Sequence, residues 1–240
     1  MKFMRKKIIK FVVTGLLTIV VSDTFAQADW NVIERSNILS SDSLVKGKYT
    51  LVFINKDTAL DLKVKQQMID AFFKVYPKEA RAYNANTAKK VTFIIDPAYN
   101  GVAATGGNLV RYNPDWFHKH PQDIDVVTHE VMHIVQSYPN GAGPGWITEG
   151  IADYVRYKFG VNNEGANWKM PEYSAKQNFN NSYRITARFF VWIEKNYDKK
   201  FVKKLDEAMR TKQYKDDFSK NNTGKTFEEL WSEYGNNSAI

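Results

Sequence analysis

The sequence predicts an α+β fold in a single domain. Short strand patterns gather in the first half of the chain, and helical patterns fill most of the second half. Strands that come first and helices that follow are typical of the α+β class, whereas regular alternation of the two favours a parallel sheet. The chain has no internal repeat. We therefore expect one domain with a small N-terminal sheet and a helical C-terminal part.

Residues 1–26 are expected to be a secretory signal peptide, and residues 27–240 the folded domain. Five Lys and Arg residues precede Phe11–Val21, an apolar run of 11 residues that is too short to span a bilayer. Small residues then place cleavage after Ala26 or Ala28, and no cysteine stands there to carry a lipid. We expect a secreted or periplasmic protein with no stable membrane insertion after cleavage.

Charge and cysteine content narrow the function classes. Loss of residues 1–26 removes five cations and one aspartate, which lowers the formal net charge from +8 to +4. This excess suits weak association with anionic surfaces and does not favour nucleic-acid recognition. The chain has no cysteine, so a metal ion would have to be bound by His, Asp or Glu. The oligomeric state stays open.

The first half of the domain contains the predicted sheet. Residues 27–46 are polar without clear periodicity, so we expect a loosely held segment there. Strands are predicted at Tyr49–Ile54, at Val91–Ile95 and, after the flexible residues 105–107, at Asn108–Tyr112. The last of these is a candidate edge strand for an extended peptide.

One helix is predicted between the first two strands. Leu60–Tyr76 has helical spacing of apolar residues, and Pro77 should interrupt it before a short turn that runs to Tyr83. The residues expected to face inward are Val64, Met68, Phe72 and either Val75 or Tyr76.

The last third is helical. Helices are predicted at about Tyr183–Lys195, Lys199–Arg210 and Phe227–Tyr234. Thr226 and Glu229 form a capping box for the last of them. Its apolar residues, expected in the core, are Phe227, Leu230, Trp231 and Tyr234.

The most specific motif is His129-Glu130-Val131-Met132-His133, which has the form HExxH. It lies in a predicted helix that Asp123 or Asp125 can cap and that Pro139 and Gly141 end. The apolar stripe of this helix is Ile124, Val127, Val131 and Ile134. Residues four apart share a helix face, about 6 Å apart along the axis, so the two histidines can bind one metal ion and Glu130 lies near its remaining position.

A second predicted helix, Trp146–Phe159, supplies a third ligand. The linker before it holds two prolines and three glycines and lets this helix double back. Glu149 can then complete a His₂Glu site that leaves the fourth position open. Asp153 lies one turn further on and can accept the outer N–H of a histidine ligand.

Other third ligands fit less well. A metzincin extension needs Gly and His where this chain has Gln136 and Pro139. The remaining histidines, His118 and His120, lie in a Pro-bounded segment, residues 113–121, that is expected to be a solvated loop.

These residues predict a peptidase that uses one Zn²⁺ ion and acts on a peptide or protein. Glu130 is the candidate general base for the attacking water. Tyr183 opens a predicted helix and is the candidate donor to the oxyanion. Zinc is expected for a His₂Glu site, although Co²⁺ or Mn²⁺ accepts similar ligands.

Five segments together, from about residue 49 to 234, resemble the basic secretory protein family, which is found in plants and bacteria and classed with zincin-like peptidases. The matching segments are His129–His133 with Gln136, Glu149–Arg156, Tyr183 with Thr186–Phe189, Leu205 with Ala208–Arg210, and Gly224–Phe227 with Leu230, Trp231 and Tyr234.

The resemblance implies a zincin-like domain with an active-site helix pair and a gluzincin-type metal site. By position, the zinc ligands would be His129, His133 and Glu149, with Glu130 as general base. Residues 111–121 depart from the plant pattern, which bears on substrate preference.

Two other functions compete with this reading. A secreted binding or defence protein with the same fold and little catalysis also fits the leader and the charge, although a mere binder has no need of Glu130. A glycoside hydrolase using Glu130 and Glu149 as its carboxylate pair leaves both histidines of the motif unexplained.

Overall fold

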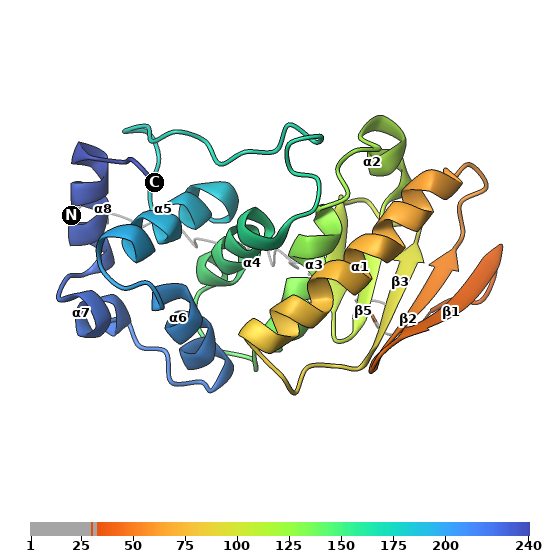
Figure 1. The fold of residues 1–240 in the computed structure, drawn as a ribbon, viewed down its shortest axis with the longest axis horizontal. Coiled ribbons are helices and arrows are strands. Elements are labelled where there is room, and N and C mark those ends of the chain that lie inside the picture. The colour runs from red at the N-terminus through yellow and green to blue at the C-terminus, as the bar shows by residue number, and fades with distance from the viewer. Residues whose placement is uncertain (1–29, 31–32) are drawn as a thin grey trace, which may run out of the picture.

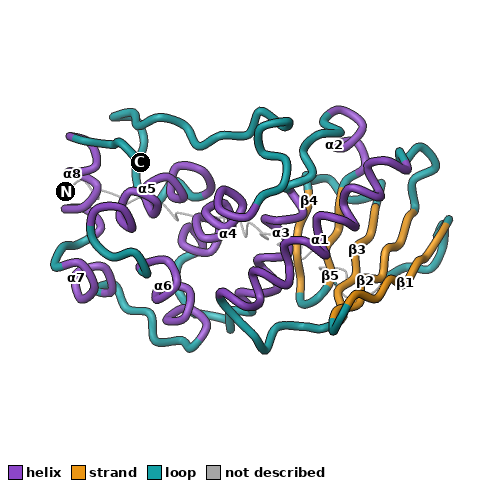
Figure 2. The backbone as a smooth tube through the Cα atoms, in the orientation of Figure 1, coloured by secondary structure: helices purple, strands orange, loops and turns teal. Residues whose placement is uncertain are grey.

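The computed structural model describes Trp30 and residues 33–240, so the expected signal peptide lies outside the described residues. The predicted α+β class is confirmed: a sheet lies at one end and helices fill the rest (Figure 1, Figure 2). The strands are β1 (Ser40–Lys46), β2 (Tyr49–Asn55), β3 (Lys90–Ile95), β4 (Ala103–Gly106) and β5 (Leu109–Tyr112). The helices are α1 (Leu62–Ala82), α2 (Pro114–Lys119), α3 (Val126–Gln136), α4 (Gly145–Phe159), α5 (Tyr183–Asn196), α6 (Phe201–Arg210), α7 (Phe218–Thr223) and α8 (Phe227–Asn236).

The five strands form one mixed sheet in the order β1-β2-β3-β5-β4. The three central strands are parallel, and the two outer strands are antiparallel to their neighbours. The prediction that Asn108–Tyr112 forms an edge strand is wrong, because β5 lies between β3 and β4. The edge strand on that side is β4, which packs against α3.

The outer strands β1 and β4 are missing from the prediction, and both belong to tight hairpins. Two residues separate the paired strands in each case. The first turn residues, Gly47 and Gly107, have φ angles of 60° and 59°. Glycine accepts positive φ without steric cost, and a two-residue loop that begins with glycine is a common hairpin turn. Part of the segment expected to be loose, and residues 105–107, are therefore ordered by the sheet.

The helix α1 runs through Pro77 for 21 residues, so the predicted interruption at this proline is wrong. Proline removes one backbone donor and crowds the preceding turn. The buried face nevertheless continues past it, because Glu79 and Ala80 are buried like the apolar residues before them. The free energy gained by burying this long face offsets the cost of the hydrogen bond that is lost at Pro77. The predicted inward residues Val64, Met68, Phe72, Val75 and Tyr76 are all buried.

Two short helices, α2 and α7, are also missing from the prediction. The segment 113–121, expected to be a loop, contains α2. Asn113 accepts a hydrogen bond from the backbone N–H of Asp115, and Pro114 occupies the first turn. An Asn cap followed by Pro is a recognised helix start, so this signal is present in the sequence. With six residues each, α2 and α7 are too short to show apolar periodicity.

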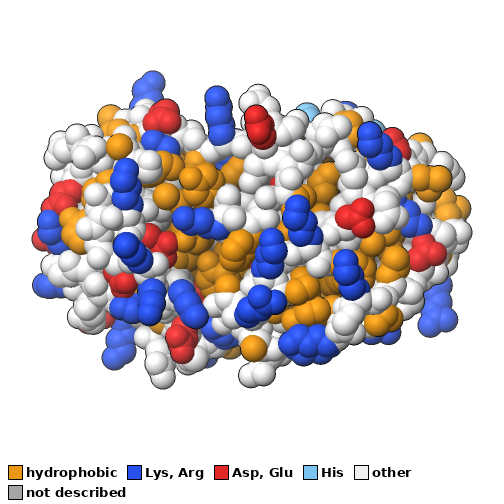
Figure 3. Space-filling model, in the orientation of Figure 1, with side chains coloured by type: hydrophobic (Ala, Val, Ile, Leu, Met, Phe, Trp, Pro, Cys, Tyr) orange, Lys and Arg blue, Asp and Glu red, His pale blue; other side chains and the backbone are white. Residues whose placement is uncertain are grey.

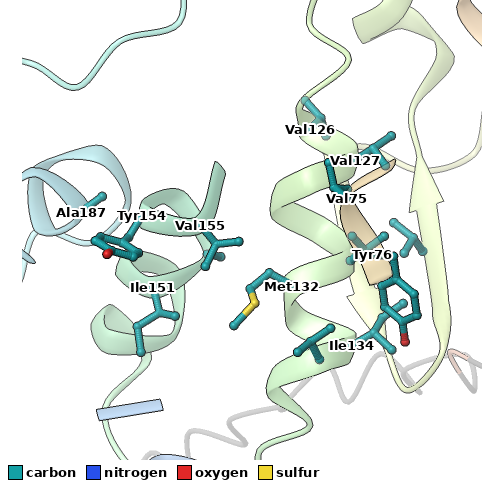
Figure 4. Close-up of a cluster of buried hydrophobic side chains, with 14 of the residues drawn as sticks. Val75, Tyr76, Val126, Val127, Met132, Ile134, Ile151, Tyr154, Val155 and Ala187 are labelled. Carbon is teal, nitrogen blue, oxygen red and sulfur yellow. The ribbon is translucent and has the colours of Figure 1, made fainter. Parts of the chain in front are cut away.

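The helix α3 lies at the centre of the core, between α1 and α4 (Figure 4). Met132 points from α3 toward α4, where Ile151 and Val155 lie, and Val127 points to the opposite side, where Val75 of α1 lies. All five side chains are buried. Burying an aliphatic side chain of this size stabilises the fold by about 1.5–3 kcal/mol. Apolar packing on two sides therefore fixes the rotation of α3 and the direction of its polar residues.

The predicted helices of the last third are confirmed as α5, α6 and α8, each within two residues of its expected start and end. The capping box of α8 is present, with both hydrogen bonds between Thr226 and Glu229 formed. Lys and Arg side chains are spread over most of the face in Figure 3, with Asp and Glu among them. Within the described part of the chain, no helix combines the length and apolar character needed to cross a membrane.

Candidate active site

The structure brings His129 and His133 together on one face of α3. Their Nε2 atoms lie 3.2 Å apart, and the two rings meet edge to face. The residues are one turn apart on a helix whose other sides are fixed by core packing, so both imidazoles point into the same cleft. This is the arrangement that the HExxH spacing predicts.

Glu149 reaches the same point from α4. Its Oε2 atom lies 3.2 Å from Nε2 of His129 and 3.6 Å from Nε2 of His133. The linker between α3 and α4 turns the chain so that the two helices pack side by side. A tetrahedral zinc ion with bonds of about 2.0–2.1 Å separates its ligand atoms by about 3.3 Å. The His129, His133 and Glu149 cluster therefore has the spacing to hold a metal ion.

The outer nitrogen of each histidine has a different partner. Nδ1 of His129 donates to Oδ1 of Asp153 at 2.7 Å, and Nδ1 of His133 donates to Oε1 of Gln136 at 2.7 Å. The amide nitrogen of Gln136 donates in turn to the carbonyl of Thr148 at 2.9 Å, which fixes the orientation of the amide. With Nδ1 protonated, both Nε2 atoms present lone pairs toward the Glu149 carboxylate. Three converging lone pairs suit a cation, so the donor chemistry fits zinc.

The pKa values of the cluster indicate the same preference for positive charge. Burial lowers the pKa of His129, but the charge and hydrogen bond of Asp153, together with Glu149, raise it on balance to about 10. Burial raises the pKa of Glu149, but hydrogen bonds from His129 and His133 hold it well below its usual range. The protein therefore stabilises a cation at the centre of the cluster, either a proton or a metal ion.

Glu130 is held beside the cluster by a residue of the sheet edge. Its side chain is 6% exposed and lines the cleft. Thr105 of β4 donates to Oε2 of Glu130 at 2.7 Å, and its hydroxyl also lies 2.9 Å from the backbone carbonyl of the same residue. Thr105 has no signal in the sequence that points to this role, because the contact joins a strand and a helix 25 residues apart.

Tyr183 stands at the start of α5 and lines the cleft. It is 54% exposed, and its ring stacks on that of His129 with centroids 6.1 Å apart. Ser182 and Tyr183 have φ angles of 65° and 49°, an uncommon pair for residues with a Cβ. The charge of Glu149 and partial burial raise the pKa of the Tyr183 hydroxyl, so it keeps its proton at neutral pH and can donate a hydrogen bond.

The cleft has a volume of about 1270 Å³ and extends past both ends of α3. It reaches Asp123 and Val126 at one end and Gln136 and Tyr138 at the other. His120 lies on its wall, against Trp116, at a ring separation of 4.2 Å. The other candidate from the same segment, His118, pairs instead with Asp57 at 2.9 Å. His118 is not among the residues that line the cleft.

Comparisons with known proteins identify a family for this chain. A family model described as "BSP: Peptidase of plants and bacteria" matches residues 36–234. A search of curated proteins found no match.

Among solved structures, this chain is similar to a mutant two-domain M1 zinc metallopeptidase bound to L-tryptophan, with 11% identity, a TM-score of 0.47 and coverage of 84% of this chain and 52% of that one. It is also similar to a mutant M1 zinc metallopeptidase from Deinococcus radiodurans, with 10% identity, a TM-score of 0.44 and coverage of 83% and 52%. An aminopeptidase N family protein from Idiomarina loihiensis matches with 10% identity, a TM-score of 0.42 and coverage of 84% and 44%. The chain thus spans about half the length of these structures.

Proposed function

The chain belongs to the BSP family of plant and bacterial peptidases, and on this premise we propose that it is a zinc-dependent peptidase. The observation that carries the proposal is the convergence of His129, His133 and Glu149 in a cleft that also holds Glu130. Two helices that only pack together do not require three potential metal-ligand atoms within 4.8 Å of one another. A metal site with a general base in the same cleft requires this arrangement.

We assign His129, His133 and Glu149 as the three protein ligands of one zinc ion. Asp153 and Gln136 hold the two imidazoles in the tautomer that presents Nε2. Zinc bound there would lower the pKa of water and polarise the carbonyl of the substrate.

Glu130 acts as the general base in this proposal. It takes a proton from the attacking water and passes it to the leaving amine. The hydroxyl of Thr105 holds one oxygen of the carboxylate, which leaves the other oxygen for the proton. Because Thr105 belongs to β4, the same strand that borders the cleft also orients the base.

Tyr183 is proposed to donate a hydrogen bond to the oxyanion. It keeps its proton, it lines the cleft, and its ring lies over His129. A donor fixed before the reaction stabilises the developing charge without reorganisation. The unusual backbone of Ser182 and Tyr183 supports this role, because such conformations concentrate at functional sites.

The substrate is proposed to be an extended peptide that lies along β4. This strand, rather than β5, forms the edge of the sheet, and three of its four residues, Ala103, Ala104 and Thr105, line the cleft. The 11 residues of α3 span about 16 Å, the length of about five extended residues. A cleft that passes both ends of α3 accepts a chain on each side of the scissile bond, which favours an endopeptidase. The leader predicted at residues 1–26 supports secretion or a periplasmic location.

Zinc content and hydrolysis should be measured on the same preparations. The samples are the domain from residue 27, its Glu130→Gln variant and, as a matched control, Glu164→Gln, which changes an exposed glutamate outside the cleft. We expect one zinc ion in each and cleavage of a mixed peptide library by all except Glu130→Gln.

Two results would contradict the proposal. Well-folded protein without bound metal would remove the basis of the site. If every sample held one zinc ion and none cleaved any peptide, the alternative function, a secreted binding protein with this fold and little catalysis, would be favoured.

A further inference from the structure

At the N-terminal end of α3 the cleft has an aromatic wall that the proposed chemistry does not use. Trp116 of α2 and Trp168, from the loop after α4, both line the cleft and are only partly buried. Val126 and Arg156 lie in the same lining. We call this region the aromatic pocket and define it by Trp116, Val126, Arg156 and Trp168.

The polar groups of the aromatic pocket are already paired with one another. The Asp123 carboxylate accepts a hydrogen bond from the Trp116 indole at 3.0 Å and forms an ion pair with Arg156. Arg156 is 5% exposed, and its Nε donates to Asn163 at 3.1 Å. The positive charge of Arg156 is thus balanced within the wall by Asp123, so this arginine is not free to select an acidic side chain.

The flat groups of the pocket are arranged to stack. The Arg156 guanidinium lies 4.6 Å from the ring centre of Trp168, a cation–π contact that fixes the indole. Trp116 packs its ring against His120. Each indole is covered by a protein neighbour and still contributes surface to the cleft. A planar apolar side chain would bury this surface and gain aromatic pairing in addition.

The wall that carries Trp168 is held in place by hydrogen bonds within the chain. Asp125, at the N-cap position of α3, caps no backbone N–H of its own helix, and its Oδ1 accepts from the hydroxyl of Thr128 at 2.7 Å. The same carboxylate accepts from the backbone N–H groups of Val161 at 2.7 Å and Asn162 at 2.5 Å, which lie in the loop after α4. The N–H of Trp168 then donates to the carbonyl of Asn163 at 2.8 Å. A wall held in this way lowers the entropy lost on binding.

The aromatic pocket lies one helical turn from a proposed metal ligand on α3, because Val126 precedes His129 by three residues. On α4, Arg156 follows Glu149 by seven residues, which is about two turns. Three helical residues rise about 4.5 Å, slightly more than one residue of an extended chain. The pocket is therefore within reach of a side chain close to the scissile bond.

We propose that the aromatic pocket binds a Phe, Tyr or Trp side chain of the substrate and sets the cleavage preference. This inference rests on the proposed peptidase function. It goes beyond that function by naming the class of peptide and the residues that select it.

The test is a set of hexapeptides in which one Phe is moved through six otherwise alanine-based positions, with the all-alanine peptide as reference. For the zinc-loaded protein we expect kcat/KM to rise by about 10- to 100-fold for a Phe at one position relative to the scissile bond, since burying a large apolar side chain has an effect of this size. Lys and Glu at that position should give no such increase. A flat profile, or a preference for a charged side chain, would overturn the inference while leaving the peptidase proposal intact.

Variants of the wall link the preference to the pocket. Trp168→Ala and Trp116→Ala should each lower the ratio of kcat/KM between the best Phe peptide and the alanine peptide by about 10-fold, and Trp168→Phe should retain most of it. An unchanged ratio in both alanine variants would overturn the assignment. Binding of the same peptides to zinc-loaded Glu130→Gln gives a second readout that needs no turnover. Preference for the Phe peptide in binding, without hydrolysis by the wild type, would support the pocket and contradict the peptidase proposal.

Discussion

The side-chain oxygen of Gln136 lies 2.7 Å from Nδ1 of His133, while the matching position on His129 is taken by the carboxylate of Asp153 at the same distance. One proposed zinc ligand is thus oriented by a neutral amide and the other by a charged carboxylate. A carboxylate raises the basicity of the imidazole more than an amide does. The two histidines are therefore not equivalent as ligands.

Gln136→Leu should weaken zinc binding by about 10-fold, because His133 then loses the acceptor that fixes its tautomer. Asp153→Leu should weaken it more, toward about 100-fold, because His129 loses a charged partner. Competition with a chelator of known affinity measures both values. Equal zinc affinity in Gln136→Leu and the wild type would show that the amide only braces the linker through the carbonyl of Thr148.

Glu149→Ala should abolish stoichiometric zinc binding. The substitution removes the oxygen that lies 3.2 Å and 3.6 Å from the two Nε2 atoms, and two histidines alone leave the site with too few ligands. Elemental analysis after dialysis measures the zinc content. Glu164→Ala is the matched control, because that glutamate is exposed and lies outside the cleft. One zinc ion retained by Glu149→Ala would show that the third ligand lies elsewhere.

The sequence predicted the metal cluster better than it predicted the surroundings. His129 and His133 belong to one helix, so their spacing alone places them on one face, and Glu149 follows once the linker is read as a turn. The strand β4 escaped prediction because its four residues, Ala103–Gly106, include no large apolar side chain that would mark a strand. The hydrogen bond from Thr105 to Glu130 could not be predicted either, because a strand that is not predicted cannot be assigned contacts.

The contacts that build the aromatic pocket could not be predicted either, because they join residues far apart in the sequence. Asp123 and Arg156 are 33 residues apart, and nothing local in either segment indicates their pairing. Asp123 or Asp125 was expected to cap α3, yet Asp123 pairs with Arg156, and the carboxylate of Asp125 accepts from backbone N–H groups of the loop after α4. Local patterns give helices and their caps, whereas the choice between a cap and a tertiary partner depends on which loop packs nearby.

Thr105→Val should lower kcat by about 10-fold without changing zinc content. Valine keeps the shape of threonine but removes the hydroxyl that holds Oε2 of Glu130, and a hydrogen bond to a charged group contributes about 1.5–3 kcal/mol. Thr105→Ser restores the hydroxyl and should recover most of the activity. Steady-state kinetics on one peptide, with zinc content measured in parallel, makes the comparison. Unchanged kcat in Thr105→Val would show that Glu130 is positioned without this contact.

Glu79→Gln should make the stability of the protein less dependent on pH. Glu79 is fully buried on α1, and neither carboxyl oxygen has a hydrogen-bond partner among the described residues. Burial raises the pKa of this carboxyl well above its usual range, with the charge of Asp125 adding to the effect and His129 opposing it.

The sign of this effect follows from linkage. Below about pH 4 the carboxyl is protonated in both the folded and the unfolded chain. Above about pH 4 the Glu79 carboxyl loses its proton in the unfolded chain but keeps it in the folded chain. The folded state therefore becomes less stable as the pH rises, until the pH reaches the raised pKa of Glu79 in the folded chain. Glutamine does not ionise, so Glu79→Gln should gain stability relative to the wild type as the pH rises from 4 to 8.

Denaturant unfolding at several pH values measures the difference in stability between Glu79→Gln and the wild type. The control Glu164→Gln, at an exposed position, should show no such trend. A difference between Glu79→Gln and the wild type that stays constant with pH would mean that Glu79 has the same pKa in both states, and so has a charged partner or water beside it in the fold.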